Sequence, residues 1–109
     1  MSPSQAIVLG DIGVEIGGPV EWHTRSGVEK RDLNIYTVTI EYQKPADQAA
    51  GTVLEWTVNI ITGTSNHEAY HITASGDIDV KQRWRYRVRV RFGATLDLRS
   101  PWRSFEVID

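Results

Sequence analysis

Hydrophobic and polar residues alternate along most of this chain, and the clearest alternation runs from Arg83 to Phe92. Tryptophan, tyrosine, valine and phenylalanine take every second position there, and arginines take the positions between them. Successive side chains of a β-strand point to opposite faces, so this segment predicts a strand with one apolar and one arginine face. The same period predicts three further long strands: Ile35 to Tyr42, Val53 to Ile61 and Trp102 to Ile108.

Shorter segments of the same character complete the set of predicted elements. They are Ala6 to Leu9, Gly13 to Ile16, Val20 to Trp22 and Ala69 to Ala74. Gly17-Gly18-Pro19 is expected to interrupt the second strand, because proline cannot donate a hydrogen bond within a central ladder. The helical period is nearly absent, and we interpret Pro45 to Ala50 as a loop. About seven short strands predict an all-β fold, an antiparallel β-sandwich.

Composition limits what such a chain can be. Its 109 residues are expected to form a single domain, residues 1–109. The lack of cysteine excludes disulfides and thiolate metal sites. No apolar run approaches the roughly 20 residues of a membrane span, so we expect no membrane partner. The start, Met1 to Gln5, lacks the regions of a signal peptide, and we expect a cytoplasmic or virion location.

Several segments resemble the fibronectin type III family. Tyr86 to Phe92 resembles its sixth strand, Ser100 to Val107 resembles the entry to its last strand, and Asn34 to Tyr42 resembles its third. Trp22 falls about where the family keeps a core tryptophan on the second strand. The resemblance implies a sandwich that serves as a binding or spacer module without catalytic residues or a cofactor.

The predicted arginine face is the first candidate site. Residues 83–109 carry seven arginines and three acids, whereas residues 1–82 carry five basic and eleven acidic side chains. The candidate binding residues are Arg85, Arg87, Arg89, Arg91 and Trp102. We favour a structural ladder, with Glu41, Glu55 or Glu106 as cross-strand partners and with Trp102 or another exposed ring between guanidinium planes. A nucleic-acid partner is not expected, because the net charge is −2.

The second candidate is His67-Glu68-Ala69-Tyr70-His71, which matches the His-Glu-x-x-His motif of zinc peptidases. That motif needs a helix to bring both imidazoles to one zinc ion, but its flanks are rich in β-branched and turn residues. We therefore interpret it as a strand, and a zinc metallopeptidase that uses His67 and His71 is a remote alternative. The strand is expected to point Tyr70, Ile72 and Ala74 inward, and His67, Ala69 and His71 outward.

The aromatic residues supply the third candidate. Trp22, Trp102 and Tyr70 have polar neighbours and are expected to be partly exposed, as residues that recognise proteins or sugars are. The alternative is an aromatic-rich core. We expect a non-catalytic, homo-oligomeric subunit of a larger assembly, such as a phage tail or virion. The alternative function is a module that binds carbohydrate or a host surface.

Overall fold

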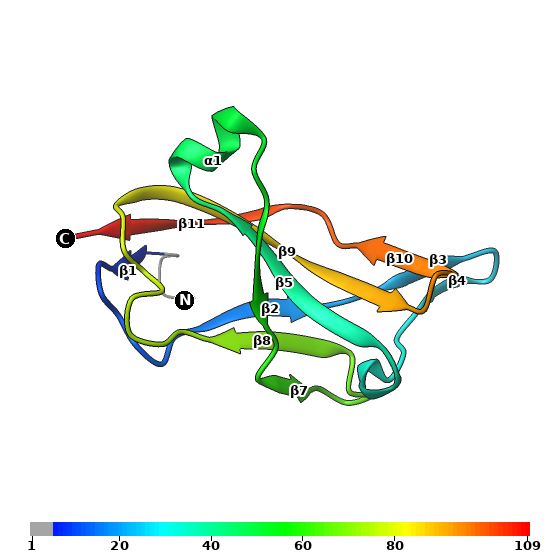
Figure 1. Ribbon diagram of the computed structural model, residues 1–109. Helices are drawn as coiled ribbons and strands as arrows, with labels where there is room; N and C mark the ends of the chain where they lie inside the picture. The colour runs from blue at the N-terminus through cyan, green and yellow to red at the C-terminus, as the bar shows by residue number, and fades with distance from the viewer. Residues whose placement is uncertain (1–5) are drawn as a thin grey trace.

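The computed structural model describes residues 6–109. Met1 to Gln5, the segment interpreted as lacking a signal peptide, lies outside the described residues. The described chain is mostly β-structure with one short α-helix and one 3-10 turn (Figure 1). No helix in this range has the length and apolar character needed to cross a membrane.

A mixed six-stranded sheet forms the larger layer, in the order β1-β11-β9-β5-β6, with β10 also paired to β9. Its strands are β1 (Ala6–Val8), β5 (Thr37–Gln43), β6 (Leu54–Thr57), β9 (Gln82–Phe92), β10 (Leu96–Arg99) and β11 (Arg103–Ile108). The prediction of a purely antiparallel arrangement is wrong, because β1 pairs in parallel with β11.

Two strands share one edge of β9. β11 pairs with its first half and β10 with its second half. Between them, the Ser100 amide donates to the Val88 carbonyl and the Ser100 hydroxyl accepts from the Val88 amide, each at 2.9 Å. Ser100 therefore pairs with the Val88 amide and carbonyl at the point where the strand beside β9 changes from β11 to β10.

A three-stranded sheet, in the order β2-β8-β7, and the two-stranded β3–β4 hairpin complete the fold. These strands are β2 (Glu15–Pro19), β3 (Trp22–Thr24), β4 (Gly27–Glu29), β7 (Ile60–Thr62) and β8 (Glu68–Ile72). The predicted strand from Val53 to Ile61 is two strands in different sheets. The chain crosses at Asn59, whose side chain accepts from the Ile72 amide at 2.7 Å.

The prediction that Gly17-Gly18-Pro19 interrupts a strand is wrong, since β2 runs through all three residues. The Val20 amide donates to His67 of the neighbouring strand segment. Alternate residues of an antiparallel strand face away from the partner, so the proline nitrogen points to the open side of an edge strand. Pro19 therefore removes no hydrogen bond from the ladder.

The expected loop at Pro45–Ala50 is instead the helix α1, which follows β5. Proline stands in its first turn, where its missing N–H costs nothing. Asp47 accepts from the Lys44 amide at 3.0 Å, and Gly51 ends the helix with φ 76°. These capping contacts explain how a helix of six residues forms without an apolar stripe.

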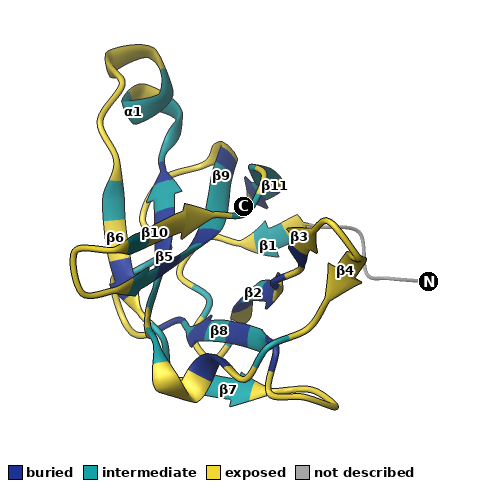
Figure 2. Cartoon of the chain, turned by 90° about the vertical axis from the view of Figure 1, so that its right-hand side faces the viewer, coloured by how far each residue is buried: buried dark blue, intermediate teal, exposed yellow. Residues whose placement is uncertain are grey.

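The core lies between the two larger sheets (Figure 2). Ile40, Trp84 and Val88 of the six-stranded sheet pack in one buried cluster with Ile16 and Ala69 of the three-stranded sheet. Ile40, Trp84 and Val88 occupy apolar positions of the predicted strands Ile35 to Tyr42 and Arg83 to Phe92. The alternation along Arg83 to Phe92 is therefore confirmed, with valines and tryptophan inward and arginines on the opposite face.

Candidate functional site

The arginine face of β9 is built around one buried carboxylate. Glu41 is opposite Arg87 in the β5–β9 ladder, and only 4% of Glu41 is exposed. Its Oε1 lies 2.7 Å from Nε of Arg87 and 3.0 Å from Nε of Arg99. Its Oε2 lies 3.6 Å from Nη1 of Arg89. Three guanidinium groups thus neutralise and cover a carboxylate that would otherwise be buried alone.

Arg89 joins three strands. It donates to both carboxylate oxygens of Asp97, at 2.9 and 2.8 Å, and to Glu55 at 3.3 Å. The bidentate contact suits the planar guanidinium. Its hydrogen bond to Asp97 raises the pKa of the Arg89 guanidinium and holds the pKa of Asp97 below its ordinary value. Arg91 is also within 3.8 Å of Glu55.

Trp102 lies between two arginines, as the sequence predicted. The guanidinium carbon of Arg85 is 4.4 Å from a Trp102 ring centre, and that of Arg87 is 3.9 Å from it. Arg85 also donates to the side chain of Gln43. Both guanidinium groups are thus held by a ring and an acceptor together. We call Glu41, Arg85, Arg87, Arg89, Arg99 and Trp102 the arginine ladder.

The carboxylates predicted as ladder partners are where the sequence placed them. Glu41 and Glu55 contact the ladder arginines, and Glu106 lies 3.5 Å from Arg83. The charge asymmetry of the sequence is therefore largely compensated in space by carboxylates from neighbouring strands. The predicted binding arginines come together, but they contact protein groups.

The His-Glu-x-x-His motif does not form a helix. Its last four residues lie in strand β8, where positions four apart are about 13 Å distant. The His71 ring stacks on Trp56 with centroids 4.6 Å apart. Its Nδ1 lies 2.7 Å from the Thr57 carbonyl oxygen, and its Nε2 lies 2.8 Å from Asp77. Both ring nitrogens therefore have partners within the protein.

The predicted orientation of this strand is wrong. His67, Ala69 and His71 are buried, whereas Tyr70 and Ile72 are half-buried and Ala74 is exposed. The reason is that Asp77 and the Thr57 carbonyl satisfy the imidazole of His71, so it can enter the core. Among residues 6–109, no group of three or more histidine, aspartate or glutamate side chains has the arrangement of a metal site.

The sequence predicts partial exposure for both Trp22 and Tyr70, but only Tyr70 is partly exposed. Trp22 is buried, with only 6% of it exposed, beneath the Arg31 guanidinium at 4.3 Å and beside Tyr36 at 5.4 Å. That expectation was therefore wrong for Trp22. Tyr70 is half-buried and donates to Glu68 at 2.7 Å. Burial, and then this hydrogen bond, raises the pKa of Tyr70 to about 12.

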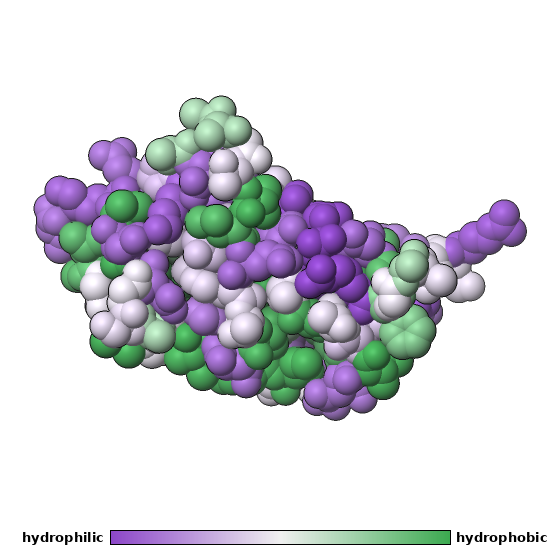
Figure 3. Space-filling model, viewed as in Figure 1, coloured by the Kyte–Doolittle hydropathy of each residue, from purple (hydrophilic) through white to green (hydrophobic). Residues whose placement is uncertain are grey.

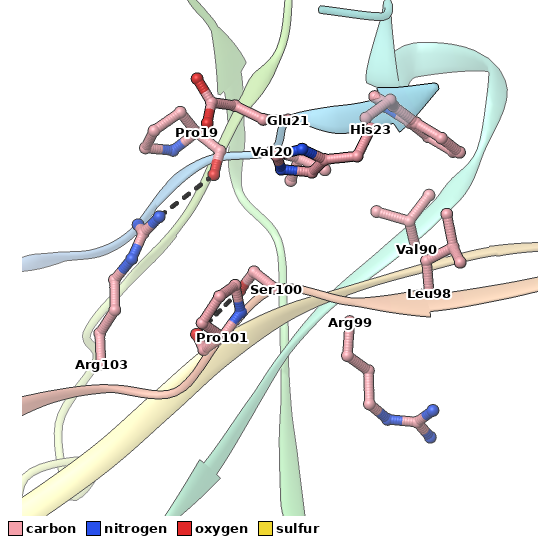
Figure 4. A pocket seen from close by; sticks show the side chains of 11 residues that line it. Pro19, Val20, Glu21, His23, Val90, Leu98, Arg99, Ser100, Pro101 and Arg103 are labelled. Atoms are coloured by element: carbon pink, nitrogen blue, oxygen red, sulfur yellow. Dashed lines mark hydrogen bonds between the residues drawn. The ribbon is translucent and has the colours of Figure 1, made fainter. Parts of the chain in front are cut away.

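A pocket of about 540 Å³ lies beside Trp22, between the turn from β2 to β3 and the segment from β10 to β11 (Figure 4). Val20 and His23 form one wall, and Ser100 and Pro101 form the facing wall. Arg103 reaches towards the Pro19 carbonyl oxygen, 3.4 Å away, at one end. The alternation of the sequence does not predict this pocket, because its walls come from segments about 80 residues apart in the chain.

Comparisons with protein-family models, with curated proteins and with solved structures give no match. The residues and their arrangement therefore carry the functional argument.

Proposed function

We propose that this chain is a non-catalytic structural module that acts through its surface, as a subunit of a larger protein assembly such as a phage tail or virion. One observation carries the proposal, namely the set of large hydrophobic residues exposed to solvent. These are Val8, Leu9, Ile12, Val28, Ile35, Val53, Val80, Phe92, Leu98 and Ile108. Where such residues lie next to one another, they form apolar patches of the kind that mark protein contacts.

The proposed architecture is a fibronectin type III-like sandwich. Three segments that resemble the family's third, sixth and last strands overlap β5, β9 and β11, which are neighbours in one sheet. The three-stranded sheet contributes to the same core. For example, His71 of β8 stacks on Trp56 of β6. A sandwich with its own core suits a module that keeps its shape while its surface makes contacts.

The arginine ladder supports a structural role for the charged face. Its guanidinium groups already have carboxylate, amide or aromatic partners, so an external anion would have to displace internal contacts. Contacts with other subunits are therefore assigned to the exposed apolar residues rather than to the arginines. This assignment also agrees with a net charge close to neutral.

The carbohydrate-binding alternative has less support. Stacking on sugar rings requires an accessible aromatic face. Trp22 is buried, and Trp102 is stacked with Arg85 and Arg87. A glycan array with the wild type and the Trp102→Ala variant tests it, and glycan binding lost in the variant would favour this alternative.

The test of the proposal is the mass in solution, measured by light scattering after size exclusion over a range of concentrations. We expect masses above the 12.3 kDa of one chain, because the exposed apolar residues are buried by contact between copies. A mass of one chain at every concentration would contradict self-assembly. Co-purification with virions would test the proposed virion location, against the cytoplasmic one.

A further inference from the structure

Of the ten large hydrophobic residues that are exposed within residues 6–109, nine lie at the two ends of the molecule. We call the first group the hairpin end, and it comprises Val28, Ile35, Phe92 and Leu98. We call the second group the terminal end, and it comprises Val8, Leu9, Ile12, Val80 and Ile108. Val53 is the tenth residue, and it belongs to neither group. Figure 3 shows hydrophobic residues at both ends, and along the lower edge over β7 and β8.

Strand β9 fixes the separation of the two ends. It begins at Gln82, two residues after Val80, and ends at Phe92. Eleven residues of extended chain span about 33 Å between the first and last Cα atoms. The longest dimension of the molecule is 44 Å. The two ends therefore face away from each other along the length of the fold (Figure 1).

The hairpin end is apolar because the six-stranded sheet has only partial cover there. Leu98 pairs with Val90, and Phe92 lies on the core-side face of β9. Tyr36 contacts both Trp22 and Phe92, with ring centroids 5.4 and 5.9 Å away. Beyond Trp22, β10 and the β3–β4 hairpin are mostly exposed (Figure 2). At this end, the core-side face of the six-stranded sheet is therefore exposed to solvent.

The terminal end is formed by segments from both ends of the described chain that are joined by backbone hydrogen bonds. Val8 pairs with Ile108, and the Leu9 amide donates to the Ile108 carbonyl at 2.7 Å. The Gly10 amide donates to the Ile78 carbonyl at 2.9 Å, which ties this surface to the loop that carries Val80. Its aliphatic residues are therefore held together by the backbone.

The charges of the two ends are opposite. The segments that carry the hairpin end, residues 22–36 and 91–99, contain five basic side chains against three acidic ones. The basic residues are Arg25, Lys30, Arg31, Arg91 and Arg99, and the acidic residues are Glu29, Asp32 and Asp97. The loops of the terminal end carry four aspartates against one lysine, Lys81. The aspartates are Asp11, Asp77, Asp79 and Asp109.

We propose that the hairpin end of one copy docks on the terminal end of a second copy, so that the chain assembles head to tail. This inference rests on the proposed function and specifies its geometry. Apolar residues face apolar residues in such a contact, while basic and acidic flanks meet. A heterologous contact between opposite ends leaves both outer ends free, so it extends into an open series.

The size of the ends sets the strength of this contact. The two shorter dimensions are 32 and 23 Å, so an end covers roughly 600 Å² per partner, below the ~800 Å² of a standard interface. We therefore expect weak association, in which the mean mass rises steadily with concentration. A closed oligomer would instead give a mass that reaches a plateau.

Cross-linking tests the geometry, and the absence of cysteine gives the experiment a clean background. We would introduce single cysteines as Val28→Cys and Ile12→Cys, combine them in one double variant, and treat each protein with a short bis-maleimide. Val53→Cys is the matched control, because Val53 is an exposed aliphatic residue in the segment between α1 and β6, outside both groups. The wild-type mass is measured in parallel at the same concentration.

The expected result is a ladder of dimers, trimers and longer products from the double variant. A mixture of the two single variants should give dimers, and each single variant alone should remain a monomer. If the wild type associates but the double variant gives no ladder, or a single variant dimerises as strongly, the head-to-tail geometry is wrong and self-assembly stands. If the wild type is monomeric at this concentration, both the head-to-tail geometry and self-assembly are wrong.

Serine substitutions give a second readout without a cross-linker. Ile12→Ser and Ile35→Ser should each weaken association at least several-fold in sedimentation equilibrium, because each removes an aliphatic group from one partner. Val53→Ser should leave it unchanged. Equal weakening by all three variants would contradict the assignment of the contact to the two ends. Circular dichroism spectra that match the wild type would show that the variants are folded.

Discussion

Glu41 and Arg87 face each other across the β5–β9 ladder, with Oε1 of the glutamate 2.7 Å from Nε of the arginine. This pair explains why an arginine-rich strand is compatible with a compact fold. The carboxylate is almost fully buried, whereas the arginine side chain is 21% exposed. Glu41 is therefore the group on which the arginine ladder depends, and the arginines shield it from water.

Glu41→Gln should destabilise the protein by about 2 kcal/mol, because it leaves several partly buried guanidinium groups without their shared charge. The measurement is urea unfolding at neutral pH. Glu55→Gln is the control, since the Glu55 side chain is 37% exposed and its loss should cost less than about 1 kcal/mol. Equal losses for the two variants would contradict the central role of Glu41.

Trp102→Ala should lower the free energy of unfolding by about 1–2 kcal/mol, because Arg85 and Arg87 lose the ring with which they stack. Trp102→Phe should recover part of that loss, since it keeps an aromatic face. Denaturant unfolding followed by circular dichroism measures both. If alanine and phenylalanine give the same loss, ring stacking is not the source of the stability.

Zinc retention should be far below one ion per chain, because His71 uses both ring nitrogens within the protein. Incubation with zinc, desalting and elemental analysis provide the measurement, with His71→Ala as the comparison. Wild type and variant should retain the same trace amount. One zinc per chain in the wild type that disappears in His71→Ala would restore the metallopeptidase alternative.

Asp77 should make stability depend on pH in the acid range. Burial pushes its pKa upward, but hydrogen bonds from the Ala74 amide and the His71 ring outweigh burial, so the pKa of Asp77 is lowered. Nearby Lys44 acts in the same direction. The unfolded chain therefore takes up the proton at higher pH than the folded protein, and stability present above about pH 4 is lost as pH falls further.

The test variant is Asp77→Asn. The control is Asp109→Asn, because the side chain of Asp109 is 76% exposed. Thermal unfolding between pH 7 and pH 3 gives the change in stability with pH for each protein. Asp77→Asn should be less stable at pH 7 and should lose less on acidification than the wild type. Asp109→Asn should follow the wild type. A wild-type slope retained in Asp77→Asn would show that another group is responsible.

Gly17 and Gly18 should differ sharply in their tolerance of alanine. A Cβ atom at Gly17 would overlap the Ala69 carbonyl of the neighbouring strand, and backbone cannot move aside easily. A Cβ atom at Gly18 would meet only the guanidinium of Arg103, which can rotate away. We expect Gly17→Ala to cost about 3 kcal/mol or more and Gly18→Ala about 1 kcal/mol. Equal costs in urea unfolding would contradict this packing.

The long strands were predictable because their alternation reflects a local requirement. β9 has one face on the core and one face on the arginine ladder, so every second residue reports its environment. The ladder partners were also predictable, since cross-strand neighbours of arginine are selected for opposite charge. Glu41, Glu55 and Glu106 meet that requirement.

The remaining features depend on contacts between distant segments. The local pattern predicts that His71 is exposed, because its partners, Asp77 and the Thr57 carbonyl, come from other segments. The crossing between β6 and β7 lies within a continuous apolar alternation, so the pattern predicts one strand there. Pro19 is acceptable only because β2 is an edge strand, which a local pattern does not reveal.

The solution mass of the wild type across a concentration series tests the central claim most directly. Contact through two apolar ends predicts a mean mass that rises steadily above 12.3 kDa as the protein is concentrated. A mass that stays at 12.3 kDa from dilute to concentrated solution would contradict the claim that these ends bind other copies of the chain.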